Sequence, residues 1–119
     1  MKSHHLVIAL ALSSTALMPL TVSASPYDGR YRLNSSWDCR SVGSDGGAIR
    51  IQGNSFEGVE SSCQMSNPTS VRDMAAHLYD LSCSGEGETY SYRLMIMRAD
   101  RGDIYLIKNG YASLWQKCR

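Results

Sequence analysis

The sequence predicts an all-β protein: a small antiparallel up-and-down barrel or sandwich of about seven or eight strands, with two disulfides and at most one short helical turn. Three observations predict this fold. Apolar and polar residues alternate along several short segments, turn signals separate these segments, and four cysteines lie in the same part of the chain. Closure into a barrel would also remove the unpaired strand edges that invite aggregation.

The first 24 residues have the pattern of a secretory signal peptide. Lys2 provides a weakly basic start, Leu6 to Leu12 is an unbroken apolar run, and Val22-Ser23-Ala24 supplies the small residues before a cleavage site. We therefore expect cleavage after Ala24. The alternative is a membrane anchor, but Pro19 and polar residues interrupt the apolar stretch, and a spanning helix needs about 20 apolar residues.

Residues 25–119 are then expected to form a single domain that is periplasmic or secreted, with no membrane span in the mature form. Removal of Lys2 leaves 11 Lys and Arg residues against 11 Asp and Glu residues, so the mature net charge is close to zero. A near-neutral chain without a basic run offers no electrostatic footprint for nucleic acid. Nucleic acid is therefore not expected as a partner.

Cys39, Cys63, Cys83 and Cys118 are expected to form the two disulfides, because an even number of cysteines in a small exported domain is usually fully oxidised. No C-x2-C pair is present, so neither a metal nor another cofactor is expected. Three connectivities are open. Pairing in sequence order, Cys39 with Cys63 and Cys83 with Cys118, is the preferred one.

The first half of the expected domain contains three alternating segments. Residues 27–33 place Tyr31 and Leu33 on one face and arginines on the other, which predicts a strand, and Trp37 and Cys39 form a shorter alternating pair. Composition predicts a loop over 42–47. A strand over 48–52 then reaches Gly53-Asn54, a hairpin signal that returns the chain into a strand over 55–65.

The region after this hairpin is ambiguous. Asn67-Pro68-Thr69 predicts a turn, whereas residues 70–76 are compatible with helix or strand. We expect one helical turn near Val71 to Ala75, followed by a strand over 77–84 in which Tyr79, Leu81 and Cys83 alternate.

The last third has the clearest strand pattern, over 89–98, where four apolar residues share one face (Tyr90, Tyr92, Leu94 and Ile96). A glycine-bearing loop over 84–88 precedes this strand, and a tight turn over 99–103 follows it. Strands over 104–108 and 111–118 complete the chain around Asn109-Gly110, a strong hairpin signal.

No catalytic residues are predicted, and we do not expect an enzyme. His77 is the only histidine after the expected cleavage site, and it has no nucleophile motif beside it. The carboxylates Glu57 and Glu60, or Glu86 and Glu88, are close enough in sequence to leave a periplasmic hydrolase as an alternative. A structural envelope protein without soluble activity is a further alternative. The Arg101-Gly102-Asp103 tripeptide is best explained as turn chemistry.

The favoured function is an exported, non-enzymatic binding module, either an inhibitor of a protein or a binder of an envelope component. Tyr, Trp and Arg are frequent in residues 25–119, and these residue types anchor protein interfaces. Binding residues concentrate on loops held by a rigid scaffold. We therefore expect partner contacts on the two polar loops that flank the clearest strand, at Ser84, Gly85, Glu86, Glu88, Arg101 and Asp103.

Four short motifs carry a family resemblance: Trp37-x-Cys39, Cys63, Cys83-Ser84-Gly85-Glu86-Gly87 and Trp115-x-x-Cys118. They resemble small exported cysteine-containing proteins of Gram-negative bacteria with no assigned function. The chain is more distantly similar to periplasmic C-type lysozyme inhibitors, which are small disulfide-bearing barrels with a Ser-Gly-x-x-Tyr inhibitory loop. Here Tyr90 follows Ser84-Gly85 two residues too late, so this resemblance implies a binding barrel and transfers no inhibitory residue.

Overall fold

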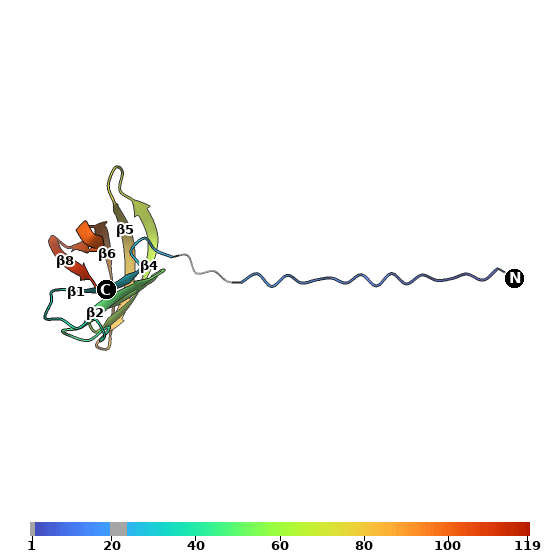
Figure 1. Cartoon of the computed structure of the whole chain (residues 1–119), viewed down its shortest axis with the longest axis horizontal. Helices are drawn as coiled ribbons and strands as arrows, with labels where there is room; N and C mark the ends of the chain where they lie inside the picture. Colours follow the sequence, from blue (N-terminus) through green and yellow to red (C-terminus); the bar gives the residue numbers. More distant parts are fainter. Residues whose placement is uncertain (1, 20–23) are drawn as a thin grey trace.

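The computed structural model describes residues 2–19 and 24–119 and shows a closed eight-stranded antiparallel barrel (Figure 1). Each strand pairs with the next one in the chain, and the last strand pairs with the first. The predicted fold class is confirmed, and of its two versions the barrel is the correct one. The elements are β1 Gly29–Arg32, β2 Ala48–Gln52, β3 Ser55–Gly58, β4 Ser61–Ser70, β5 Ala76–Gly85, β6 Glu88–Arg98, the 3-10 turn η1 Asp100–Gly102, β7 Ile104–Lys108 and β8 Tyr111–Lys117.

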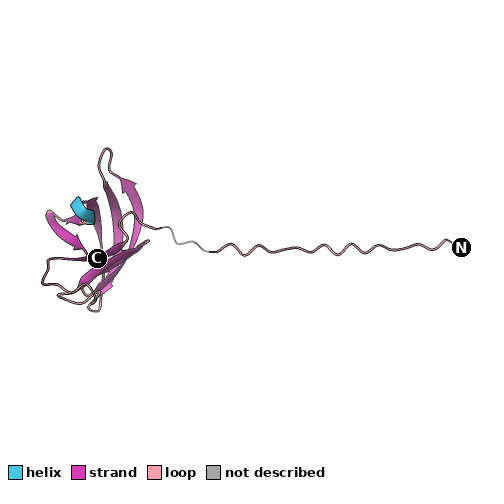
Figure 2. Cartoon of the chain, viewed as in Figure 1, coloured by secondary structure: helices cyan, strands magenta, loops and turns pink. Residues whose placement is uncertain are grey.

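Residues 2–19 form no helix or strand and run away from the barrel (Figure 2). In the described ranges, no helix has the length and apolar character needed to cross a membrane. Residues 22 and 23 of the expected cleavage motif lie outside the described residues.

Alternation of side chains builds the core, as the sequence pattern predicted. On β6, Leu94 and Ile96 point inward and are almost completely buried, and Leu81 on β5 is fully buried. Each side chain of this kind contributes about 1.5–3 kcal/mol of burial free energy. Because successive strands supply these residues in register, the core runs continuously from β1 to β7.

The two ends of the barrel differ. The residues just before β1 close the end that carries the β2–β3, β4–β5 and β6–β7 connections, which we call the closed end. Tyr27 is only 2% exposed there, its hydroxyl lies 2.7 Å from Nδ1 of His77, and its carbonyl accepts a 2.6 Å hydrogen bond from the Tyr31 hydroxyl. Burial raises the pKa of Tyr27 to about 12, so this buried hydroxyl stays protonated at neutral pH.

The opposite end, which we call the open end, carries the β1–β2, β3–β4, β5–β6 and β7–β8 connections. Asn109 and Gly110 both have positive φ, 49° and 74°, as expected for the predicted hairpin turn. The loop predicted over 84–88 is shorter than expected. Ser84 and Gly85 belong to β5 and Glu88 begins β6, so Glu86 and Gly87 alone form a two-residue turn.

Three local predictions are wrong, and each error comes from strand pairing that a local pattern does not reveal. The expected strand over 55–65 is two strands, β3 and β4, joined by a tight turn at Val59 and Glu60. The expected turn at Asn67-Pro68-Thr69 lies inside β4, where the register with β5 shifts between Ser66 and Thr69. Proline lacks an N–H, so a strand tolerates it where the ladder is interrupted.

The expected helical turn near Val71 to Ala75 is a hairpin connection instead. The β4–β5 ladder extends to the pair Ser70 and His77, and the Val71 N–H donates to the Ala76 carbonyl at 3.0 Å. This pairing leaves too few residues for a helix, and Asp73 has a φ of 59°, which is incompatible with one. The one helical turn of the described residues is η1, within the predicted tight turn over 99–103.

The two expected disulfides are present, but the preferred pairing in sequence order is wrong. Cys63 pairs with Cys83, and Cys39 pairs with Cys118. Cys63 and Cys83 face each other directly across β4 and β5, with Cα atoms 4.0 Å apart. Cys39, on the β1–β2 connection, reaches Cys118 just after β8 because β8 pairs with β1.

We predict that the two disulfides stabilise the barrel unequally. The Cys39–Cys118 bond spans a sequence separation of 79 residues and the Cys63–Cys83 bond spans 20. Loop-closure entropy then predicts a loss of about 4.5 kcal/mol for Cys39→Ser/Cys118→Ser and about 3 kcal/mol for Cys63→Ser/Cys83→Ser. Urea unfolding of the two double variants and the oxidised parent measures both losses. Peptide mapping without reductant that recovers a Cys39–Cys63 fragment would contradict the pairing.

Candidate binding site

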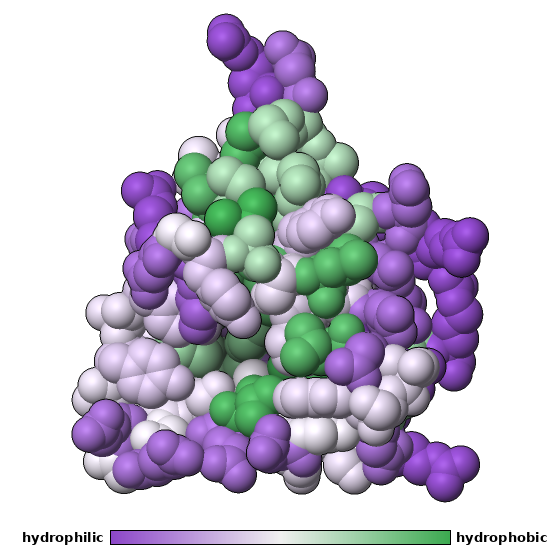
Figure 3. All heavy atoms as spheres, turned by 90° about the vertical axis from the view of Figure 1, so that its left-hand side faces the viewer, coloured by the Kyte–Doolittle hydropathy of each residue, from purple (hydrophilic) through white to green (hydrophobic). Residues whose placement is uncertain are grey.

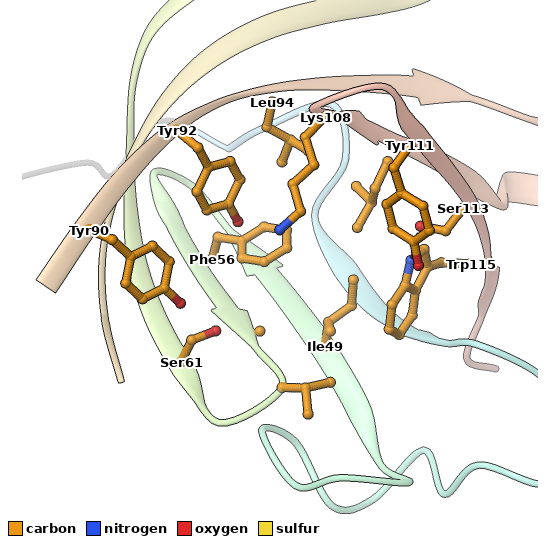
Figure 4. Close-up of a pocket in the computed structure, with 13 residues that line it drawn as sticks. Ile49, Phe56, Ser61, Tyr90, Tyr92, Leu94, Lys108, Tyr111, Ser113 and Trp115 are labelled. Atoms are coloured by element: carbon orange, nitrogen blue, oxygen red, sulfur yellow. Dashed lines mark hydrogen bonds between the residues drawn. The ribbon is translucent and has the colours of Figure 1, made fainter. Parts of the chain in front are cut away.

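A cavity of about 270 Å3 opens at the open end of the barrel. Figure 4 shows its wall, built from the inward side chains of β2, β3, β6, β7 and β8 together with the β3–β4 turn and the start of β4. The lining residues are Ile49, Phe56, Gly58, Val59, Ser61, Tyr90, Tyr92, Leu94, Leu106, Lys108, Tyr111, Ser113 and Trp115.

The cavity exists because small residues occupy inward positions at this end of the barrel. Gly58, Ser61 and Ser113 fill little of the space between the strands, whereas the closed end is filled by Tyr27 and Tyr31. Figure 3 shows apolar side chains gathered around a hollow in the middle of one face, with hydrophilic side chains along its edges. The open end therefore offers a concave apolar surface of the kind that ligand sites use.

Two tyrosines of β6 form one side of the cavity. The rings of Tyr90 and Tyr92 are stacked, with centroids 6.2 Å apart and an interplanar angle of 12°. Burial raises the pKa of Tyr92 to about 12, so its hydroxyl remains a hydrogen-bond donor at neutral pH. Figure 4 shows both hydroxyls pointing into the cavity. Tyr90 is 44% exposed and extends the wall to the rim.

Lys108 is the only charged residue among the 13 that line this cavity. It is the last residue of β7 and shares the inward face with Ile104 and Leu106. Its Nζ lies 4.1 Å from the centroid of the Tyr92 ring, a cation–π contact worth about 0.5–2 kcal/mol. Within residues 2–19 and 24–119, the carboxylate ion pairs are Arg50–Glu57 and Arg93–Asp80, so no carboxylate pairs with Lys108 there.

Trp115 forms the wall opposite β6 and is held from two sides. Its indole Nε1 donates to the Ser113 hydroxyl at 3.0 Å, and its ring contacts the Trp37 ring edge-on, with centroids 6.1 Å apart. Trp37 lies on the β1–β2 connection, which the Cys39–Cys118 disulfide ties to the end of β8. The disulfide therefore also supports the cavity wall.

The partner-binding residues predicted from sequence do not form one surface. Ser84, Gly85, Glu86 and Glu88 lie on the β5–β6 hairpin at the open end, whereas Arg101 and Asp103 follow β6 at the closed end. Asp103 has a structural role there, because its carboxylate accepts a 2.8 Å hydrogen bond from the Lys117 N–H. Only the first four residues are positioned near the cavity.

Gly85 has a steric role within that hairpin. A Cβ atom at this position would lie 2.4 Å from the backbone carbonyl oxygen of Glu60, far inside van der Waals contact. The absence of a side chain thus lets the β3–β4 turn approach the β5–β6 hairpin. These two turns form one edge of the open end.

The acidic residues are arranged differently from their spacing in sequence. Glu60 lies beside Glu86 of the neighbouring hairpin, and a hydrogen bond between the two side chains raises the pKa of Glu60 above its ordinary value of 4.5. Glu57 instead pairs with Arg50, 3.9 Å away. Glu60 and Glu86 are outside the set of residues that line the cavity, so this arrangement places no acid–base pair inside it.

Other chemistry-bearing residues lie away from the cavity. His77 is at the closed end, hydrogen-bonded to Tyr27. In the part of the chain that the structure describes, no group of three or more His, Cys, Asp or Glu side chains could hold a metal ion.

The cavity residues themselves were missed as a group by sequence reasoning. The sequence pattern places Tyr90 and Tyr92 on one strand face and among the aromatic residues that could anchor a partner, and it places Lys108 on a hairpin strand without indicating a side. A usable signal was available, since Ile104, Leu106 and Lys108 alternate and therefore share one face. That face becomes a cavity wall only when β8 closes on β1.

We predict that Glu86→Gln makes stability less dependent on pH. A carboxyl whose pKa is raised by folding binds its proton more tightly in the native state, so its contribution to stability declines as pH rises above about 4.5, the ordinary value. Removing the Glu86 charge removes that decline. Urea unfolding at pH 4 and pH 7 measures how much the free energy of unfolding changes between the two pH values. Glu88→Gln is the control, because it removes the same charge two residues away. An equal effect of both variants would contradict the specific Glu60–Glu86 contact.

Comparisons with known proteins identify no relative of this chain. No protein-family model, curated protein or solved structure matches it.

Proposed function

We propose that this protein is an exported, non-enzymatic binding protein that holds its ligand in the cavity at the open end of the barrel. One observation carries the proposal: a concave cavity of about 270 Å3, with five aromatic residues among the 13 that line it, opens to solvent through partly exposed tyrosines. Binding sites of this kind combine apolar walls with a few polar groups that orient the ligand. Here Lys108 and the two tyrosine hydroxyls are those polar groups.

Two features support export. Both pairs of cysteines are joined as disulfides, and disulfides persist mainly in oxidising compartments such as the periplasm or the extracellular space. The signal-peptide pattern of the first 24 residues agrees with this location. The resemblance to small exported proteins and to C-type lysozyme inhibitors points to the same class of binding barrel.

The ligand is a protein or an envelope component in this proposal. Tyr90 and Tyr111 are 44% and 62% exposed at the rim, where they are available to a side chain or head group inserted from outside. Of the residues predicted from sequence, Ser84, Gly85, Glu86 and Glu88 are close enough to the open end to contact a large ligand. A binding role needs no tuned base or nucleophile, which distinguishes it from the hydrolase alternative.

We predict that Tyr90→Ala/Tyr111→Ala weakens ligand binding at least about ten-fold, because truncation of aromatic anchors commonly costs more than about 1 kcal/mol each. The measurement is capture of periplasmic and secreted components on the immobilised protein, followed by titration calorimetry with the retained component. Tyr105→Ala/Leu114→Ala is the matched control, since these two residues pair across β7 and β8 and do not line the cavity.

Equal loss of affinity in both double variants would place the ligand outside the cavity. Turnover of a glycan or peptide that disappears in Glu60→Gln would replace the binding proposal with the hydrolase alternative.

A further inference from the structure

The cavity contains a single charge whose placement needs a reason. Lys108 faces inward between β6 and β8, although a lysine at the end of a strand can usually extend its ammonium group into bulk water. An ammonium group has three N–H donors, and the Tyr92 ring 4.1 Å away provides no lone pair to accept them, so the partly exposed ammonium of Lys108 can donate to water or to a bound ligand. Figure 4 shows the Lys108 side chain reaching across the cavity rather than away from it.

The groups around Lys108 select for negative charge. None of the 13 described residues that line the cavity is acidic, and both ion pairs of the described residues lie elsewhere on the barrel. The hydroxyls of Tyr90 and Tyr92 point into the same space and can donate hydrogen bonds to an anion. One cation with neighbouring hydroxyl donors is complementary to one anionic group.

The rest of the wall selects for an apolar body. Phe56, Leu94 and Trp115 lie among the lining residues, with Ile49 and Leu106 beside them. A cavity of about 150 Å3 lined by apolar residues holds benzene. The volume of about 270 Å3 therefore has room for a larger ring system or a short acyl chain, and its opening allows a longer ligand to protrude.

The carboxyl groups at the rim limit the total charge. Glu60 and Glu86 lie together at the edge formed by the β3–β4 and β5–β6 turns, whereas Lys108 belongs to the β7–β8 side. A polyanion would bring negative charge towards this acidic edge. A ligand with one anionic group can place it at Lys108 and avoid that repulsion.

We infer that the cavity binds a monoanionic amphiphile, with an aromatic ring or short acyl chain among Phe56, Leu94 and Trp115 and a carboxylate, sulfonate or similar group at Lys108. This inference rests on the proposed function and specifies its ligand class. Such a ligand is an envelope component, for example the exposed end of an envelope lipid, so the inference narrows the two ligand classes of the proposed function to one.

A matched pair of fluorescent probes tests the inference: 8-anilinonaphthalene-1-sulfonate carries one sulfonate, and N-phenyl-1-naphthylamine has the same ring system without it. The oxidised protein, as it is recovered after export, is titrated with each probe. We expect Lys108→Met to weaken binding of the sulfonate probe at least ten-fold and to change binding of the neutral probe less than two-fold. Added salt should weaken binding of the sulfonate probe and leave binding of the neutral probe unchanged.

Arg50→Gln is the control, because it removes one positive charge from the outer surface of the barrel, where Arg50 pairs with Glu57. It should leave both probes unchanged. Near-ultraviolet circular dichroism checks that each variant is folded. If Lys108→Met does not fold, the parent protein still tests the inference, through its affinity for each of the two probes and the salt dependence of each affinity.

Equal binding of both probes to the parent, without salt dependence, would overturn the anionic inference and leave the cavity as a binding site. An equal effect of Lys108→Met and Arg50→Gln would overturn it as well. Failure of both probes to bind the parent would overturn this inference, whereas the proposed function is decided separately by the Tyr90→Ala/Tyr111→Ala comparison.

Discussion

Closure of the barrel between β1 and β8 is the constraint on which the rest of the structure depends. This junction is the shortest ladder of the barrel, with only the pairs Tyr31–Lys117 and Arg32–Gln116. It is reinforced by the Cys39–Cys118 disulfide, which joins the long β1–β2 connection to the end of β8. The Cys118 N–H donates to the Arg30 carbonyl at 2.9 Å, and this bond extends the junction beyond the ladder. Without closure, β7 and β8 would not face β2 and β3, and the cavity would have no opposite wall.

Side-chain size along the strands then decides which end of the closed barrel is filled. At one end Tyr27 and Tyr31 occupy the interior, and the Lys117 ammonium covers the Tyr31 ring at 4.9 Å while donating to the Asp28 carbonyl. At the other end, glycine and serine take inward positions and leave space between the aromatic rings. The same alternating pattern thus produces a packed core at one end and a cavity at the other.

The parts of this fold that could be predicted from sequence are those set by neighbouring residues. Alternation along 89–98 and the Asn109-Gly110 turn are local signals, and both correspond to the structure. The disulfide pairing could not be predicted, because it depends on which strands become neighbours. Residues 71–75 had helical composition, but the β4–β5 ladder around them determined their conformation. The cavity was missed for the same reason, since its walls come from strands that are distant in sequence.

The position of the cavity also changes how the proposed binding function would work. Loops were expected to carry it, yet the groups suited to a ligand are on strands: Tyr92 on β6, Lys108 on β7 and Trp115 on β8. Side chains on paired strands are held by the ladder and by core packing, so little conformational entropy remains to be lost on binding. The Lys108 ammonium already lies against the Tyr92 ring, so its N–H groups are positioned to donate hydrogen bonds to an incoming anion. Lys108 is partly exposed, so its charge costs the empty barrel little, and the proposed anionic ligand would give its inward position a function.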